Sequence, residues 1–290
     1  MRLALGRTVL DLDRRCAVMA IVNRTPDSFY DRGRTADLDA ALRHALAQVE
    51  AGADIVDVGG VKAGPGEDVP LEVELERVVP FVRAFREHSD VPLSVDTYRA
   101  AVAEAALDAG ADLVNDVSGM VEPRIADVVA ARPGTALVVM HAGGPPRTRP
   151  FRPCYLPDVT SVVVERLAAL AAEAQRRGVP AEQIVVDPGH DFGKNTVHSL
   201  ELTRRLPEIA ALGYPVLVAL SRKDFLGEVL GEDVGPEERL EASLAAAVLS
   251  LCGGARIVRV HDTKATVRAL RPAEAILGWR QPAVSARGLE

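Results

Sequence analysis

The sequence predicts an α/β fold, a TIM (β/α)8 barrel with a short N-terminal β extension that closes its bottom. Eight short runs rich in Val, Ile and Leu alternate with eight longer amphipathic segments. The short runs are almost continuously apolar, which is typical of parallel strands buried on both faces. Glycine or proline usually closes each longer segment, as at the end of a helix. A doubly wound open sheet is the alternative, but eight regular units without a GxGxxG motif favour the barrel.

The expected elements follow one another without interruption. Strands are expected over 17–22, 54–58, 93–95, 113–116, 136–141, 184–187, 216–220 and 257–260. Helices are expected over 37–51, 71–88, 99–109, 122–131, 158–177, 197–212, 236–251 and 264–276. Residues 6–12 resemble an additional strand, half of a hairpin at the barrel's bottom. Because no linker rich in Pro, Gly or Ser divides the chain, we expect a single domain over residues 1–290.

Composition excludes several classes of protein. With 34 Lys and Arg against 41 Asp and Glu, the 290-residue chain has a net charge of −7, which argues against a general nucleic-acid binder. It has no apolar window long enough for a secretory signal or a membrane span. Its three cysteines are far apart and show no metal-binding spacing. This pattern predicts a reduced, cytoplasmic protein.

Polar residues stand at the ends of most expected strands, where TIM barrels carry their chemistry. Each has a structural interpretation: an Asp can cap a helix or form a turn, and an Arg can pair with a nearby acid. A group of them around one cavity is harder to explain, because buried polar groups need partners. The sequence therefore predicts a ligand site formed by Asn23, Asp96, Asn115, Asp187, Lys223, Arg259 and His261.

The chemistry of these residues suggests a ligand with two parts. One group of four residues offers several acceptors and one ammonium donor, which suit a flat heterocycle with a guanidine-like edge. The other three lie on adjacent strands and suit a phosphate or pyrophosphate, with Asn23 as a ligand for Mg²⁺. The heterocycle group is Asp96, Asn115, Asp187 and Lys223, and the anion group is Asn23, Arg259 and His261.

Six motifs occur in order over essentially the whole chain. They are Asn23-Arg-Thr-Pro-Asp-Ser-Phe29, Ser94-Val-Asp-Thr97, Asn115-Asp116, Asp187-Pro-Gly189 with Phe192-Gly-Lys194, Ser221-Arg-Lys223 and Arg259-Val-His261. Together they resemble those of the dihydropteroate synthase family. The resemblance implies a pterin-binding TIM barrel of folate biosynthesis, often a homodimer. Such an enzyme condenses 6-hydroxymethyl-7,8-dihydropterin pyrophosphate with p-aminobenzoate and releases pyrophosphate.

The resemblance also assigns expected roles to individual residues. The pterin would be held by Asp96, Asn115, Met140, Asp187 and Lys223, and the pyrophosphate by Asn23, Arg259 and His261. Asn23 would also help to bind Mg²⁺. The acceptor side would include Asp31, Lys62, Phe192 and Ser221. The family mechanism is dissociative, so no side chain is expected to act as a covalent nucleophile.

The departures from the family gather on the acceptor side. The family's second loop usually reads Gly-Gly-Glu-Ser-Thr-Arg-Pro-Gly, whereas residues 59–66 read Gly-Gly-Val-Lys-Ala-Gly-Pro-Gly. Arg24 replaces a Val of the first loop, and His190 and Asp191 replace a small apolar pair. These changes are similar to those of the divergent second paralogue of actinobacteria. They add positive charge near the mouth and suggest an acceptor more anionic than p-aminobenzoate.

Three functional hypotheses remain from the sequence. The first is a transferase of the dihydropteroate synthase type that uses p-aminobenzoate or a related amine. The second is a catalytically impaired protein that binds the pterin pyrophosphate and has a regulatory role. The third is a pterin-dependent methyltransferase, which Arg259 and His261 disfavour because a methyl-folate brings no pyrophosphate to them.

Overall fold

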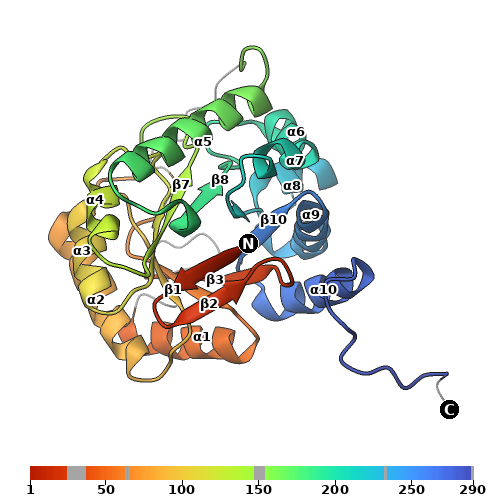
Figure 1. The fold of residues 1–290 in the computed structure, drawn as a ribbon, viewed down its shortest axis with the longest axis horizontal. Helices are drawn as coiled ribbons and strands as arrows, with labels where there is room; N and C mark the ends of the chain where they lie inside the picture. The colour runs from red at the N-terminus through yellow and green to blue at the C-terminus, as the bar shows by residue number, and fades with distance from the viewer. Residues whose placement is uncertain (25–36, 63, 65, 147–153, 232–233, 289–290) are drawn as a thin grey trace.

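Eight parallel strands close into a barrel, and helices surround it (Figure 1). The computed structural model describes residues 1–24, 37–62, 64, 66–146, 154–231 and 234–288. Around the barrel the strand order is β10-β3-β4-β5-β6-β7-β8-β9, which confirms the predicted TIM barrel. The strands are β3 (Ala17–Asn23), β4 (Ile55–Gly59), β5 (Leu93–Asp96), β6 (Leu113–Asp116), β7 (Ala136–Met140), β8 (Ile184–Asp187), β9 (Val216–Val218) and β10 (Ala255–Val260).

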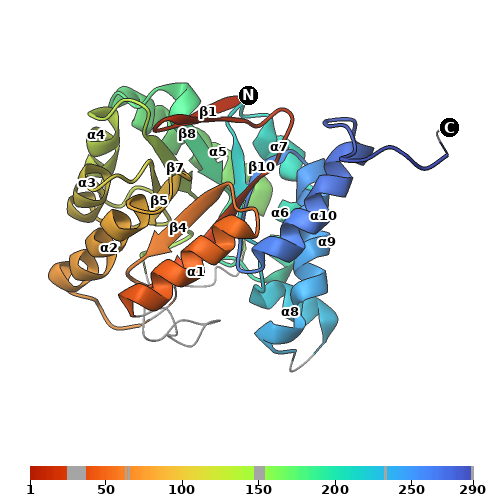
Figure 2. The same ribbon diagram turned by 90° about the horizontal axis from the view of Figure 1, so that it is seen from below.

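Helices cover the outer face of the barrel (Figures 1 and 2). Asp37 and Asp158 cap the first and fifth helices, because their carboxylates accept backbone N–H groups of the first turn. The helices are α1 (Leu38–Glu50), α2 (Leu71–Arg86), α3 (Ala100–Asp108), α4 (Arg124–Ala130), α5 (Val159–Arg176), α6 (Thr196–Arg204), α7 (Leu206–Ala210), α8 (Asp224–Leu230), α9 (Leu240–Cys252) and α10 (Thr263–Ile276). Two short 3-10 turns cover Ala181–Gln183 and Pro236–Glu238.

The structure corrects three of the expected elements. The helix expected over 197–212 is divided into α6 and α7 at Arg205, because Pro207 lacks the N–H that an uninterrupted helix would use. The helix expected over 236–251 begins as a 3-10 turn and becomes α-helical at Leu240. Strand β9 ends at Val218 rather than at residue 220, and the short helix α8 was not predicted.

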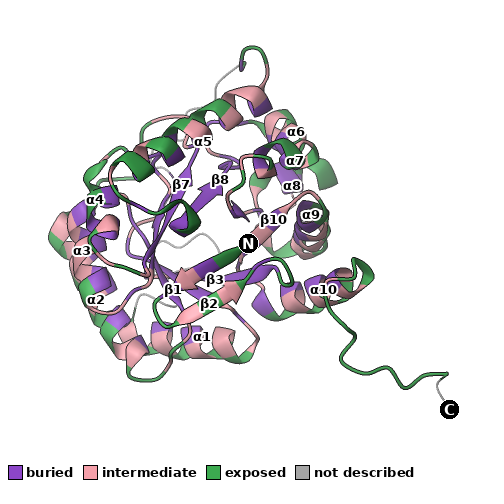
Figure 3. Ribbon diagram, in the orientation of Figure 1, coloured by how far each residue is buried: buried purple, intermediate pink, exposed green. Residues whose placement is uncertain are grey.

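The alternation of side chains along each strand separates two apolar layers. Val18 and Val56 face outward and pack in the layer between barrel and helices, whereas Met19 and Ile55 face the barrel's interior. The strands are therefore buried on both faces (Figure 3), as their continuous apolar runs predict.

A two-stranded hairpin closes one end of the barrel, as the sequence predicts. Strands β1 (Arg2–Leu5) and β2 (Thr8–Asp11) pair antiparallel and lie across this end (Figure 2). Leu3, Leu5 and Leu12 are buried in the same cluster as the interior side chains of the barrel. The opposite end of the barrel, where the strands have their carboxyl termini, is not covered by the hairpin. We call this end the mouth of the barrel.

The length and hydrophobicity of a helix decide whether it can cross a membrane. Among the described residues, no helix is long and apolar enough to cross a bilayer.

We expect the Leu5→Ala variant to lose about 2–5 kcal/mol of unfolding free energy, because it opens a cavity in the barrel's interior. Val9→Ala, on the same hairpin at a position that is 54% exposed, should change stability by no more than about 0.5 kcal/mol. Urea denaturation of both variants tests this role. Equal losses would show that Leu5 does not support the interior.

Candidate active site at the mouth of the barrel

The period of two along each strand brings the polar residues to the barrel axis. The interior positions Ile55, Leu113, Val185 and Ile257 are apolar and belong to one buried cluster. Two residues further along the same strands stand Asp57, Asn115, Asp187 and Arg259. Successive side chains of a strand alternate between faces, so these four project into the barrel near its mouth.

Arg259 connects two carboxylates across the mouth. Its Nε donates to Asp57 Oδ2 at 2.6 Å, and its Nη2 donates to Asp96 Oδ2 at 2.9 Å. Asp57 also accepts from Ser94 Oγ at 2.5 Å and from Asn115 Nδ2 at 3.3 Å. Arg259 thus pairs with neighbouring acids, which is the structural interpretation that the sequence also allowed. It nevertheless lies on one of the strands predicted to hold the anion.

Asp57 is the mouth residue that sequence reasoning missed. It is fully buried and contacts Arg259, Ser94 and Asn115. Its place within a strand, two residues before the strand's end, hid it among the buried positions. The spacing of two residues after the interior Ile55 is the signal that could have found it.

Asn115 presents an acceptor toward this network. Its side chain is buried, and its Oδ1 has no hydrogen-bond partner in the described part of the chain, although its Nδ2 donates to Asp57. A buried amide oxygen without a donor costs free energy. The atom is therefore suited to accept an N–H group of a ligand.

On another side of the mouth, two lysines lie near an aromatic ring. Asp187 Oδ1 accepts the backbone N–H of Gly189 at 2.7 Å. The Lys223 ammonium donates to the carbonyl of His190 and lies 4.7 Å from the centroid of the Phe192 ring. The fully buried Lys194 donates to the carbonyls of Gly189 and Phe192 at 2.8 and 2.9 Å. Lys194 therefore fixes the loop that carries Phe192.

The other predicted residues that the structure describes also lie around the mouth. Ser221 Oγ is 3.1 Å from His261 Nδ1 and accepts the backbone N–H of His261, which joins the ends of β9 and β10. Asn23 is half-buried at the end of β3, and Met140 is buried at the end of β7. Asp31 lies outside the described residues.

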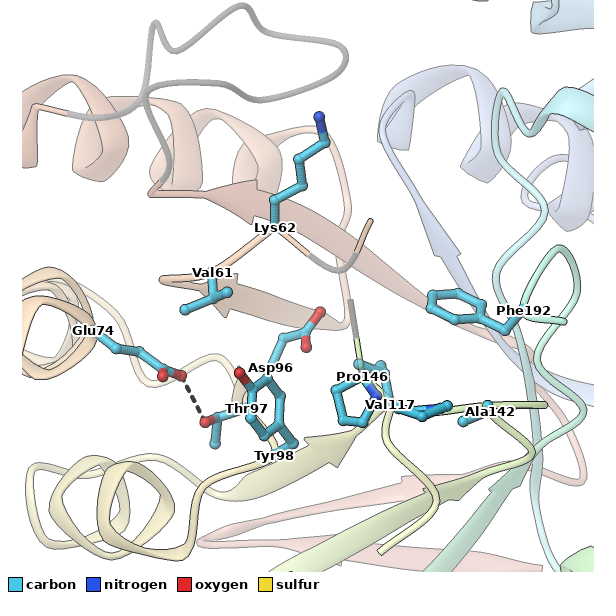
Figure 4. Close-up of a pocket in the computed structure, with 12 residues that line it drawn as sticks. Val61, Lys62, Glu74, Asp96, Thr97, Tyr98, Val117, Ala142, Pro146 and Phe192 are labelled. Atoms are coloured by element: carbon cyan, nitrogen blue, oxygen red, sulfur yellow. Dashed lines mark hydrogen bonds between the residues drawn. The ribbon is translucent and has the colours of Figure 1, made fainter. Parts of the chain in front are cut away.

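A pocket opens beside Asp96 (Figure 4). Tyr98 and Phe192 contribute aromatic surface to it, and Lys62 stands at its rim with its side chain extending away from Asp96. Glu74 is fully buried and accepts from Thr97 Oγ1 at 2.7 Å and from Arg99 at 2.9 Å. The pocket joins the predicted pterin residue Asp96 to two predicted acceptor-side residues.

Burial dominates the electrostatics of the mouth. It raises the pKa of Asp96 to about 7, because the attraction of Arg259 does not offset desolvation and the neighbouring charges of Asp57 and Glu74. Burial also raises the pKa of Asp187, against the opposing effects of the Gly189 N–H and Lys223. Carboxyl groups perturbed in this way are frequent at functional sites.

This mouth and fold define a pterin-binding barrel. Residues 19–261 match the sequence profile described as pterin binding enzyme. The chain is 50% identical over 281 residues to the inactive dihydropteroate synthase 2 of Mycobacterium tuberculosis (strain H37Rv), covering 95% of this chain and 87% of that one. It is 40% identical over 282 residues to the dihydropteroate synthase of Escherichia coli K12, covering 97% and 98%. The chain therefore belongs to the dihydropteroate synthase family.

Solved structures agree with this assignment. The Yersinia pestis dihydropteroate synthase in a sulfonamide drug complex superposes with a TM-score of 0.90 at 38% identity, covering 96% of this chain and 100% of that one. The Xanthomonas albilineans enzyme in complex with 7,8-dihydropteroate has a TM-score of 0.83 at 38% identity, covering 98% and 100%.

We expect the Asp96 carboxyl to titrate near pH 7 in the free protein. Because its folded pKa exceeds its usual value of 3.8, the folded protein holds a proton that the unfolded chain releases. The contribution of Asp96 to stability is therefore present at low pH and is lost as the pH rises from about 4 to about 7.

Carboxyl ¹³C NMR tests this expectation. The resonance that titrates near pH 7 should vanish in Asp96→Asn and persist in Asp90→Asn, which removes an exposed carboxyl. An Asp96 midpoint near pH 4 would contradict the expected electrostatics.

Proposed function

We propose that the chain is a transferase of the dihydropteroate synthase type. It condenses 6-hydroxymethyl-7,8-dihydropterin pyrophosphate with p-aminobenzoate or a related arylamine and releases pyrophosphate. The observation that carries this proposal is the convergence of three buried acceptor side chains, Asp96, Asn115 and Asp187, on the mouth of one barrel. A dihydropterin offers several N–H groups on one flat edge, which such acceptors recognise. A Xanthomonas albilineans relative whose structure contains 4-aminobenzoic acid supports the acceptor class.

The pterin lies, in this proposal, among Asp96, Asn115, Met140, Asp187 and Lys223. Asn115 Oδ1 receives one of the ligand's N–H groups and so gains the partner that it lacks in this structure. Asp187 is already oriented by its bond from the Gly189 backbone. The fixed carboxylates then face the position at which positive charge develops on the pterin.

The pyrophosphate lies near Asn23, Arg259 and His261. Arg259 uses its Nε and one Nη2 hydrogen for Asp57 and Asp96, and a guanidinium has five N–H donors. We assign its remaining donors to the leaving group. A guanidinium bound to both carboxylates and pyrophosphate would couple the two halves of the ligand.

Magnesium fits this site as a companion of the pyrophosphate. In the described part of the chain, no three His, Cys, Asp or Glu side chains are grouped to hold a metal. Mg²⁺ commonly keeps several waters and binds through substrate phosphates with few protein ligands. Asn23 can provide one amide oxygen, and the bound ion would neutralise charge on the leaving group.

The proposed reaction needs no covalent intermediate with the protein. The bond between the pterin methylene carbon and the pyrophosphate oxygen breaks, and its electron pair leaves with pyrophosphate. The amine nitrogen then forms a bond to that carbon and gives up a proton to the released pyrophosphate. Asp96 and Asp187 stabilise the transient cation, and Phe192 and Tyr98 shield it from water.

A catalytically impaired protein that binds pterin pyrophosphate and has a regulatory role is the alternative. Two observations favour it: the loop over residues 59–66 departs from the family pattern, and the 50% identical relative of Mycobacterium tuberculosis is named inactive. This alternative shares the pterin residues and differs only in lacking amine-dependent release of pyrophosphate. We also propose that the chain acts in the cytoplasm as a homodimer, which sedimentation analysis can test.

We expect wild-type protein with Mg²⁺ to bind the dihydropterin pyrophosphate, and Asp96→Asn and Asp187→Asn to weaken binding at least tenfold. Each substitution replaces a charged acceptor by an amide, and a hydrogen bond to a charged group contributes about 1.5–3 kcal/mol. Calorimetric titration measures the change, and Asp90→Asn serves as the control. Unchanged affinity in both mouth variants would exclude this pterin site.

A further inference from the structure

Beside the mouth lies a guanidinium with two buried nitrogens that have no acceptor in the described part of the chain. Arg24 directly follows β3, and its backbone N–H donates to the carbonyl of Gly59 at 2.8 Å. The residue is only 7% exposed, and its Nε and Nη1 atoms, which are shielded from solvent, have no hydrogen-bond partner among the described residues. A buried charge without partners is costly, so an orphaned guanidinium points to an acceptor that arrives with a ligand.

A second guanidinium, that of Arg77, is bound to the same loop as the Arg24 backbone. Arg77, on α2, donates through Nη1 to the carbonyl of Gly60 at 2.8 Å. Its charge lowers the pKa of Arg24, in addition to the larger effect of burial, and Asp37 acts in the opposite direction. The Oδ1 atom of Asp37 already accepts the backbone N–H of Ala40 as the cap of α1. Glu74, whose pKa the charge of Arg77 lowers, accepts from Thr97 and Arg99. Each arginine therefore has a nearby carboxylate that already accepts other hydrogen bonds.

The pair adjoins the pocket beside Asp96. Gly60 packs so closely against α2 that a Cβ atom would lie 2.9 Å from Val78, which holds this loop near Arg77. The next two residues, Val61 and Lys62, line the pocket on the side opposite Phe192 (Figure 4). The two arginines thus bind the loop that forms this wall of the pocket, which also contains the predicted acceptor-side residues Lys62 and Phe192.

The position differs from that of the pyrophosphate group. Side chains alternate along β3, with Ile21 two residues before Asn23 and Val22 two residues before Arg24. Val22 packs in the outer layer between barrel and helices, so Arg24 follows the outward face, toward α2. Arg259 instead projects into the barrel and contacts Asp57 and Asp96.

We propose that Arg24 and Arg77 form an additional anion subsite, which binds a second carboxylate or phosphate group carried by the acceptor amine. The inference rests on the proposed transferase function. Guanidinium groups bind such oxyanions through paired N–H donors. The preferred acceptor then carries an anionic group beyond the single carboxylate of p-aminobenzoate.

The main test compares two amines on an unreactive complex. Protein saturated with 6-hydroxymethyl-7,8-dihydropterin, Mg²⁺ and pyrophosphate is titrated calorimetrically with p-aminobenzoate and with p-aminobenzoylglutamate, which has two carboxylates. We expect wild type to bind p-aminobenzoylglutamate at least tenfold more tightly. Arg24→Met and Arg77→Met should reduce this preference to less than twofold. Arg83→Met, which removes an exposed charge from the same helix, should preserve it.

Equal affinities of wild type for the two amines would overturn the proposal, as would equal weakening of both amines in Arg24→Met. If the pterin binds but the amines do not differ, the subsite fails and the proposed function stands. If the pterin does not bind, the proposed function fails, and a second measurement decides the subsite.

That second measurement is the melting temperature in inorganic phosphate without pterin. Phosphate should raise the melting temperature of wild type and of Arg83→Met, and it should have less effect on Arg24→Met and Arg77→Met. Without phosphate, Arg24→Met should melt no lower than wild type, because the variant removes an unsatisfied buried charge. If phosphate raised the melting temperatures of all variants equally, Arg24 would be a purely structural residue. The same would hold if Arg24→Met melted lower than wild type without phosphate and was still stabilised by phosphate. Phosphate stabilisation through Arg24 without any preference between the amines would contradict the acceptor assignment.

Discussion

The ion pairs of Arg259 with Asp57 and Asp96 organise the mouth of this barrel. They connect β10 with β4 and β5 across the intervening β3, so one side chain fixes the relative positions of three strand ends. Asn115 and Ser94 are attached to the same network through Asp57. Removing one partner of a buried pair typically costs about 3–5 kcal/mol, so each of these residues limits what can replace the others. The geometry of the proposed pterin site depends on this network.

The two sides of the mouth are built differently. On the proposed pterin side the carboxylates of Asp96 and Asp187 are buried and held by defined partners. On the proposed acceptor side, Lys62 stands at the rim of the pocket, and Arg24 brings a buried charge with unsatisfied nitrogens among the described residues. This contrast fits the proposal that the pterin site is retained while the acceptor side differs. We infer that change has concentrated on the amine rather than on the pterin.

Much of the fold follows directly from the sequence, because strands buried on both faces leave continuous apolar runs. The site residues at strand ends could be predicted for the same reason, since a parallel barrel brings those ends together. Asp57 was missed because it lies within a buried run, and its pairing with Arg259 spans 202 residues that only the closed barrel brings together. The break between α6 and α7 was also missed, although the position of Pro207 indicates it. The functional roles of the site residues stay predictions.

The most direct test of this account is pyrophosphate release by the purified protein. The assay supplies Mg²⁺ and 6-hydroxymethyl-7,8-dihydropterin pyrophosphate, with and without p-aminobenzoate or p-aminobenzoylglutamate. The account predicts that an amine accelerates release and that a pterin–amine product forms in equal amount. Tight binding of the pterin pyrophosphate without amine-dependent release would contradict the transferase and leave a binding protein. Such an outcome would keep the Arg259 network as a ligand site and remove its catalytic role.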